Sequence, residues 1–312
     1  MMQNDNNSDY LDNDVSRTDN KPILNSTNEL TEVEQMEAIK DMKTNFVFFF
    51  GKPSSGKSAI LSSIIYCLRQ GNIMSSSGEK IGGSLTVQNK LDDDSGIILE
   101  NIIHEQMKKR RFVDRTTAGS ITYLGIEYTP DKSKKLPSID VTFLEMSGED
   151  LKKVEVNRDG LGKLPSNIDV FFKATEISLL FILTAHWKEA AADDQRTANF
   201  LEYLIRQNPD LKKTRVILLI SQWDKNPNKD KEGVNEFVKN KMKATYTLME
   251  DSKNVVNEYS IGHVIELDKS PYIEKFNDIY PSQLWKFIYK SITGQDLDKK
   301  SFLDKLLEKI KI

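Results

Sequence analysis

Cysteine, histidine and long apolar runs are scarce in this 312-residue chain, and each scarcity excludes a class of protein. A single cysteine, Cys67, cannot form a disulfide framework. The longest apolar run covers only residues 177–185, well short of the roughly 18 residues that a membrane-spanning helix needs. The three histidines, His104, His186 and His263, lack the spacing of metal ligands. We expect a cytoplasmic globular protein with no secretory signal.

An excess of charge of one sign is lacking too, because 44 Lys and Arg stand against 47 Asp and Glu, for a net charge of −3. A nearly balanced chain has no global field for a polyanion, so we expect no nucleic-acid partner. One basic run, residues 108–111, ends a predicted helix. We interpret these cations as a solvated helix C-terminus, where positive charge complements the helix dipole. The alternative is a local patch that binds nucleic acid or anionic lipid.

Composition divides the chain into three expected parts: a disordered N-terminal tail with a short helix near its end (1–44), a main domain (45–294) and a C-terminal amphipathic helix (295–312). The tail is crowded with Asn, Asp and Ser and has little to bury. Thr31 and Glu34 have the spacing of a capping box, which places the short helix at residues 29–42. The C-terminal helix is expected to dock on its own domain rather than on a membrane.

Apolar periodicity in the main domain alternates between strands and helices. Strands are predicted at 45–50, 120–128, 139–146, 177–184, 214–220 and 257–260, and helices at 58–70, 94–111, 189–207, 235–251 and 281–292. This order predicts a three-layer α/β fold with a mostly parallel central sheet and helices on both faces. The link at 129–138 is too short for a crossover helix, so its two strands form an antiparallel hairpin. Residues 71–119 form a flexible and helical insertion.

The sequence between the first strand and its helix, GKPSSGKS at 51–58, matches G-x-x-x-x-G-K-[ST]. Glycines let the backbone turn so that successive N–H groups face phosphate oxygens, and the helix N-terminus adds a favourable dipole. Lys57 would reach the β- and γ-phosphates, and Ser58 would place its hydroxyl on Mg²⁺. The alternative, a loop that only turns the chain, explains the strand, turn and helix context less well.

A second polar segment, SQWDK at 221–225, follows a predicted strand. A carboxylate can accept two hydrogen bonds from guanine N1 and N2, whereas adenine would leave it unpaired, so Asp224 would select guanine. The same spacing, S-x-x-D, is also common at helix caps, which is the alternative. After the last strand, Ser260 and Ile261 begin a loop whose backbone N–H would meet guanine O6.

Two further segments complete the pattern, RTTAG at 115–119 and EMSGE at 145–149. With these motifs in this order, residues 45–294 resemble the Ras-like P-loop GTPases of the translation-factor-related (TRAFAC) class. The insertion before the two threonines is similar to that of heterotrimeric G-protein α subunits. The resemblance implies a G-domain that binds Mg²⁺ with GTP or GDP, hydrolyses GTP, and signals to an effector protein through two switch loops.

The resemblance also assigns roles to single residues. Nucleotide contacts fall to Gly51, Ser54, Ser55, Gly56, Lys57, Ser58, Ala59, Gln222, Asp224, Lys225, Ser260 and Ile261. Metal contacts fall to Ser58, to Glu145 in place of the usual Asp, and to Thr116 or Thr117, which the sequence does not separate. Catalytic roles fall to Lys57, Arg115, Thr117, Gly148 and Glu149, with Arg111 as an alternative source of the arginine.

Glu149 stands where many of these enzymes keep a glutamine that orients the attacking water. Its charge would repel the γ-phosphate, so we expect slow hydrolysis or dependence on a GTPase-activating protein. The main hypothesis is therefore a GTP-binding molecular switch. The alternatives are a nucleotide-loaded scaffold that does not turn over, and an ATP-using P-loop NTPase or phosphotransferase, which would require Asp224 to be a helix cap.

Overall fold

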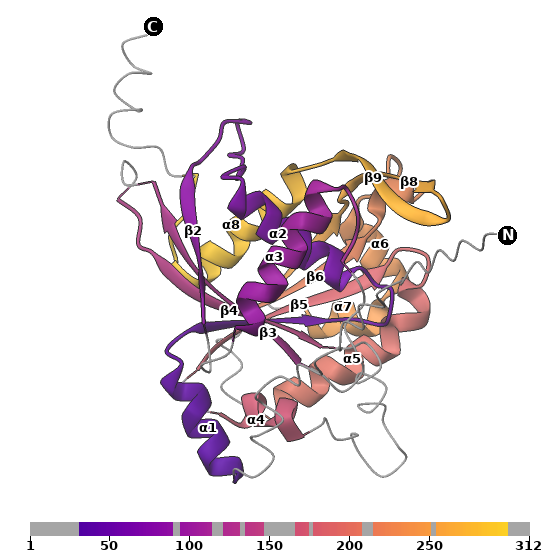
Figure 1. Cartoon of the computed structure of the whole chain (residues 1–312). Helices are drawn as coiled ribbons and strands as arrows, with labels where there is room; N and C mark the ends of the chain where they lie inside the picture. The colour runs from indigo at the N-terminus through magenta and orange to yellow at the C-terminus, as the bar shows by residue number, and fades with distance from the viewer. Residues whose placement is uncertain are drawn as a thin grey trace, which may run out of the picture.

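The computed structural model describes residues 31–89, 94–113, 121–131, 135–146, 166–174, 177–207, 215–250 and 254–298. At its centre lies a seven-stranded sheet with the order β2-β3-β4-β1-β5-β6-β7 (Figure 1). The strands are β1 Asn45–Phe50, β2 Gly83–Gln88, β3 Ile121–Pro130, β4 Ile139–Met146, β5 Ser178–His186, β6 Arg215–Ser221 and β7 Val255–Tyr259. The pairs β1–β4, β1–β5, β5–β6 and β6–β7 are parallel, whereas β3 is antiparallel to β2 and β4. The predicted α/β fold, with its mostly parallel sheet and one hairpin, is confirmed.

Helices cover both faces of this sheet. They are α1 Glu32–Asp41, α2 Lys57–Arg69, α3 Ser95–Lys108, α4 Ser166–Lys173, α5 Ala190–Gln207, α6 Val234–Lys241, α7 Lys243–Leu248 and α8 Ile279–Thr293, with a 3-10 turn, η5, at Trp223–Lys225. Two apolar cores result, one beneath α2, α3 and α8 and the other beneath α1, α4, α5, α6 and α7 (Figure 1). No helix in the described ranges combines the length and the apolar content that crossing a bilayer requires.

Strand β1 contributes to both cores, because successive side chains of a strand point to opposite faces. Phe46, Phe48 and Phe50 belong to the core beneath α4 and α5, whereas Val47 and Phe49 belong to the core beneath α2. All five side chains are buried. Burial on both faces holds the strand in the middle of the sheet. The position of Phe50, where the loop at 51–56 begins, is therefore fixed by the core.

The short helix before β1 is present as α1 and has the predicted capping box. The Glu34 N–H donates to Thr31 Oγ1 at 3.3 Å, and the Thr31 N–H donates to Glu34 Oε2 at 2.8 Å. Ile39 packs into the core beneath α4, and Lys173 of α4 forms an ion pair with Glu32 at 2.9 Å. These contacts join α1 to the body of the domain.

Three elements go beyond the sequence prediction. Strand β2 lies within the expected insertion and extends the sheet at the β3 edge. Helix α4 precedes β5. A two-stranded hairpin, β8 Gly262–Leu267 and β9 Ser270–Phe276, stands between β7 and α8. The Ile273 N–H of this hairpin donates to Arg110 O at 2.9 Å, so the basic run at the end of α3 helps to hold the hairpin.

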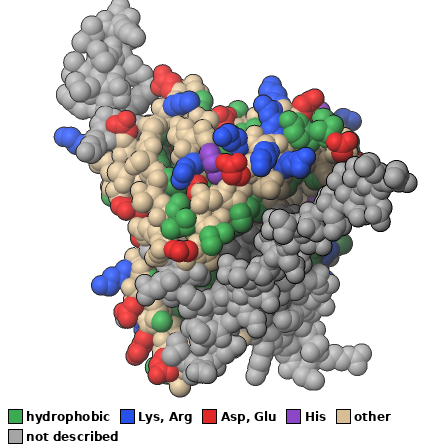
Figure 2. Space-filling view, viewed as in Figure 1, with side chains coloured by type: hydrophobic (Ala, Val, Ile, Leu, Met, Phe, Trp, Pro, Cys, Tyr) green, Lys and Arg blue, Asp and Glu red, His purple; other side chains and the backbone are tan. Residues whose placement is uncertain are grey.

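The face that carries α3 and this hairpin is not uniformly positive. Figure 2 shows Lys and Arg side chains on it with acidic side chains among them. His263 and Glu274 form one exposed pair of this kind, 2.7 Å apart between Nδ1 and Oε2. A mixed surface of this kind is typical of a solvated face.

The single helix predicted at 235–251 is in fact two helices, α6 and α7, which meet at Met242. The cause lies in another helix. Asp194 of α5 accepts hydrogen bonds from the backbone N–H groups of Ala244 at 3.0 Å and Thr245 at 2.8 Å. These bonds satisfy the free N–H groups at the start of α7, so Asp194 does what an N-cap side chain does in other helices.

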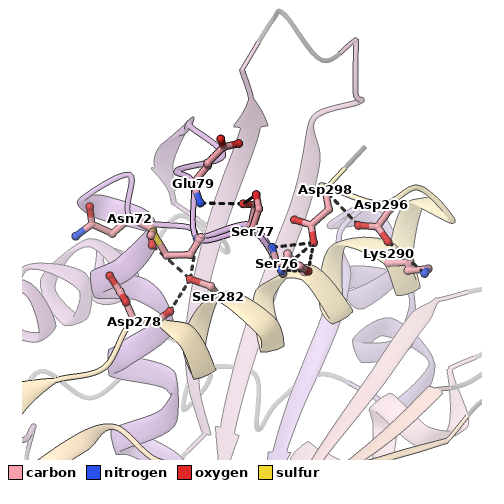
Figure 3. Close-up of polar contacts among 12 residues, drawn as sticks. Asn72, Ser76, Ser77, Glu79, Asp278, Ser282, Lys290, Asp296 and Asp298 are labelled. Atoms are coloured by element: carbon pink, nitrogen blue, oxygen red, sulfur yellow. Dashed lines mark hydrogen bonds and ion pairs between the residues drawn. The ribbon is translucent and has the colours of Figure 1, made fainter. Parts of the chain in front are cut away.

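The loop that follows α2 is tied to α8 by a chain of polar contacts (Figure 3). Ser282 Oγ accepts from the Met74 N–H at 3.0 Å and donates to Asp278 O at 2.5 Å. Farther along α8, Lys286 pairs with Asp298 at 3.0 Å, and Asp298 also accepts from Ser76 Oγ. The end of the described chain is thereby held beside the loop.

Candidate functional site

The loop at 51–56, the predicted phosphate loop, joins β1 to α2 through a turn with left-handed backbone positions. Its backbone φ is positive at Gly51 (155°), Ser54 (67°) and Gly56 (98°). A Cβ on Gly51 would collide with Thr184 and with Ser55 Oγ, so no other residue fits there without displacement of the loop. Gly56 is the N-cap of α2, and the helix begins at Lys57.

Lys57 lies folded over its own loop. Its Nζ donates to Gly51 O at 2.7 Å and to Lys52 O at 3.0 Å, and only 7% of the residue is exposed. The next two residues, Ser58 and Ala59, continue the first turn of α2 and are half-buried. An ammonium group and a helix N-terminus therefore converge on the space inside the loop, where an anion would be stabilised.

A buried hydroxyl on the neighbouring strand supports the loop from behind. Thr184 of β5 donates to Phe50 O at 2.9 Å, and its Oγ1 lies 2.6 Å from Ser55 Oγ. Ser55 is 1% exposed, so its hydroxyl serves the structure of the loop. The sequence analysis did not single out Thr184. The available signal was a hydroxyl within the buried apolar run of the strand, residues 179–185.

The segment at 221–225 lies next to the phosphate loop at the carboxyl end of β6. A Cβ on Gly56 would stand 3.5 Å from Ser221 Cβ, so the two segments touch. Gln222 has a left-handed backbone (φ 53°), and the chain then enters the turn η5. No side chain of the described residues caps η5, and Ser221 Oγ instead donates to Ala185 O at 3.4 Å. The helix-cap alternative therefore does not describe this segment.

Asp224 is half-buried within η5. Its carbonyl accepts from Lys229 Nζ at 3.1 Å. Its carboxylate has no hydrogen-bond or ion-pair partner among the described residues, so nothing in that part of the chain competes with a ligand for its oxygens. The carboxylate also influences Tyr280, whose pKa is raised to about 12 by burial first and by Glu258 and Asp224 in addition. Two carboxylates and a phenol thus lie within electrostatic reach of one another.

Gln222 is held between two side chains at the edge of this segment. Lys225 Nζ donates to Gln222 Oε1 at 2.9 Å. His186, at the end of β5, lies close to Gln222, and its pKa is lowered because burial disfavours the charged imidazole. Gln222 carries no charge itself, but Lys225 brings a cation to the same edge.

The predicted loop at 260–261 follows β7, whose Tyr259 pairs with Ser221 of β6. Ser260 is buried, and its Oγ accepts from the Gly262 N–H at 3.2 Å. The Ile261 carbonyl accepts from the Asn277 N–H at 3.0 Å, which fixes the start of the β8–β9 hairpin. The structure therefore brings Ser260 and Ile261 to the same edge of the sheet as Asp224.

The remaining predicted residues are placed only in part. Arg115, Thr116, Thr117, Gly148 and Glu149 lie outside the described residues. Glu145 is described through its backbone alone, in β4 beside Phe49 of β1, one residue before that strand ends. Arg111 forms a backbone bridge to Tyr272 of β9. The described residues contain no group of three or more His, Cys, Asp or Glu side chains that could hold a metal ion. Of the predicted Mg²⁺ contacts, Ser58 is the one whose side chain is described.

Comparison with known proteins shows likeness only to solved structures. No protein-family model matches the chain, and no curated protein matches it. Among solved structures, the chain is similar to the "Signal recognition particle receptor SRb-GTP/SRX complex from Chaetomium thermophilum". That match has 12% sequence identity and a TM-score of 0.37, and it covers 79% of this chain and 98% of that chain.

Proposed function

We propose that this protein is a GTP-binding molecular switch that binds Mg²⁺ with GTP or GDP and hydrolyses GTP slowly. The observation that carries the proposal is the loop at 51–58. Lys57 is folded over the carbonyls of Gly51 and Lys52, and the N-terminus of α2 points into the same space. Phosphate oxygens would replace these carbonyls as acceptors for Lys57, and the loop amides would donate to them.

Guanine selection is assigned to Asp224. The segment that carries it touches the phosphate loop through Ser221 and Gly56, so one nucleotide could span both. A carboxylate without a competing partner in the described chain suits the two adjacent N–H donors of guanine. Gln222, Lys225, Ser260 and Ile261 form the surroundings of the base. An ATP-using enzyme is the alternative that this arrangement favours less.

The metal and the switch residues complete the proposal. Ser58, Glu145 and one of Thr116 and Thr117 would hold Mg²⁺, which supplies neutralisation of phosphate charge. Gly148 would sense the γ-phosphate, and Arg115 would stabilise charge in the transition state. An effector protein would read the loops that carry these residues, and a GTPase-activating protein would assist hydrolysis. The proposed setting is the cytoplasm.

One experiment tests the switch against the non-hydrolysing scaffold. Nucleotide-stripped protein is titrated with Mg²⁺ and GTP, and the bound GTP is then followed in a single turnover. We expect saturable binding and slow conversion to GDP, faster in Glu149→Gln than in the wild type if the glutamate hinders the attacking water. Binding without any conversion, in both proteins and over hours, would replace the switch by a scaffold.

A further inference from the structure

Lys52, the second residue of the phosphate loop, has contacts in two directions. Its carbonyl faces inward, where it accepts from the Ser55 N–H at 3.2 Å and from Lys57 Nζ at 3.0 Å. Its side chain extends outward to α5 and forms an ion pair with Asp193. A second carboxylate, that of Glu189, lies 3.5 Å from the Lys52 ammonium. Lys52 is therefore the residue that joins the loop to α5.

The two carboxylates differ in their surroundings. The Asp193 side chain is 6% exposed and lies in the first turn of α5, whereas the Glu189 side chain is 58% exposed. A buried carboxylate costs free energy unless a cation and hydrogen bonds compensate it. Arg196 is farther away, at 3.9 Å from Asp193 Oδ1. Lys52 is thus the main cation for Asp193, and the exposed Glu189 contributes little.

The inward contacts of Lys52 depend on how its peptide group is turned. The peptide that links Lys52 to Pro53 presents the carbonyl that receives both the Ser55 N–H and Lys57 Nζ. Pro53 has a fixed φ and no N–H, which restricts the backbone on one side of that peptide. On the other side, the side chain of Lys52 is anchored to α5. Both ends of the peptide are therefore restrained.

We propose that Lys52 is a positioning residue: its ion pair with buried Asp193 fixes the 52–53 peptide and keeps the phosphate loop in its binding shape. This inference rests on the proposed function, because the phosphates are taken to be those of a nucleotide. Lys52 acts through the loop backbone and through Lys57, and its ammonium is directed away from the space inside the loop. Loss of the anchor would let the peptide rotate and would weaken phosphate binding.

A second buried carboxylate pair provides a matched control. Arg69 of α2 lies 3.4 Å from Glu100 of α3, whose side chain is 2% exposed. This pair joins two helices and makes no contact with the phosphate loop. Arg69→Met and Lys52→Met both leave a buried carboxylate without its main cation. They differ in whether the lost cation is anchored in the loop.

The test uses the full chain as wild type, Lys52→Met, Lys52→Met/Asp193→Asn, Glu189→Gln and Arg69→Met. Titration with Mg²⁺ and GTP gives the affinity, and thermal unfolding gives the stability. Hydrogen exchange of the Ser55 amide, which donates to Lys52 O, reports on the loop without nucleotide. We expect about 10-fold weaker GTP binding in Lys52→Met. Glu189→Gln and Arg69→Met should stay within about 2-fold of the wild type.

The double variant separates positioning from stability. It removes both charges, so it should regain much of the stability that Lys52→Met loses, while its affinity stays low and its Ser55 amide exchanges faster. Wild-type GTP affinity and wild-type amide exchange in the double variant would overturn the proposal. Lys52 would then serve only to balance the buried charge of Asp193 and would not position the loop. A wild-type protein that binds no GTP would instead contradict the proposed function, whatever the Ser55 amide shows.

Discussion

The loop at 51–56 and the segment at 221–225 touch each other, but they are held in different ways. The loop is held by the buried contact between Thr184 and Ser55 and by part-buried contacts of Lys57 and Lys52. In the 221–225 segment, Ser221 has a buried hydrogen bond to Ala185 O, whereas the side chains on either side of Asp224 are joined by an exposed hydrogen bond, from Lys225 to Gln222. Buried, connected hydrogen bonds and ion pairs restrain a backbone more strongly than exposed ones. We infer that the loop supplies most of the affinity and the 221–225 segment supplies the choice of base.

The largest expected effect on GTP affinity is that of Lys57→Ala in the phosphate loop. This change removes the ammonium that would donate to the phosphates, and charged hydrogen bonds of this kind contribute roughly 2–3 kcal/mol. We expect GTP binding to weaken by about 100-fold in an equilibrium titration. Lys290→Ala removes an exposed lysine that pairs with Asp296, and it should leave the affinity unchanged. Equal GTP affinity in Lys57→Ala and the wild type would remove the loop from the binding account.

Asp224→Asn should have the next largest effect, and it should act on the base alone. An amide can donate where the carboxylate accepts, so guanine N1 and N2 lose a partner while the O2 of a xanthine base gains one. We expect GTP affinity to fall by about 10- to 100-fold and the affinity for xanthosine triphosphate to rise. Competition between the two nucleotides on one preparation measures the change. Unaltered preference would show that Asp224 does not read the base.

Thr184→Val should have a smaller effect that combines stability and binding. The change keeps the shape of the side chain but leaves Phe50 O and Ser55 Oγ without their partner, at a cost of about 1–2 kcal/mol in the free energy of unfolding. The loss should also weaken GTP binding, by about 3-fold. Denaturant unfolding and titration on the same samples give both quantities.

The matched control for that change is Thr142→Val. Thr142 is also buried in the sheet, and it donates to Thr44 Oγ1 at 3.0 Å, away from the loop. Thr142→Val should lower stability without changing GTP affinity. If both valine variants weaken binding equally, the supporting role of Thr184 is wrong.

Lys225→Met should have the smallest effect. Its hydrogen bond to Gln222 is exposed, and exposed charged contacts contribute at most about 1 kcal/mol. We expect GTP affinity to fall by about 2- to 3-fold, with a larger difference at low salt because screening is weaker there. Titration at two ionic strengths shows whether this happens. A loss as large as that of Asp224→Asn would mean that the 221–225 segment depends on this lysine for its shape.

The sequence predicted the parts of the fold that have a local cause. Strand β1 has a clear burial pattern, the capping box of α1 lies within four residues, and the motif at 51–58 specifies its own turn. The bounds of β1 and β4 agree with the prediction residue for residue. Local chemistry is therefore sufficient for the central strands and for the phosphate loop.

The missed elements depend on partners that are distant in the sequence. Strand β2 starts at Gly83-Ser84, a composition typical of loops, and is a strand because it pairs with β3. The β8–β9 hairpin turns at Asp268 and Lys269, both with positive φ, where a glycine would have been the usual signal. The break at Met242 depends on Asp194 of α5. The support from Thr184 likewise appears only once β5 lies beside β1.

The most direct test of the central claim is competition between GTP and ATP for the nucleotide-stripped wild-type protein in the presence of Mg²⁺. Both nucleotides present the same triphosphate to the loop at 51–58, so any difference in affinity comes from the base. The account predicts saturable binding of GTP and GDP, with ATP at least about 100-fold weaker because adenine would leave the Asp224 carboxylate unpaired. Equal binding of ATP and GTP would contradict it.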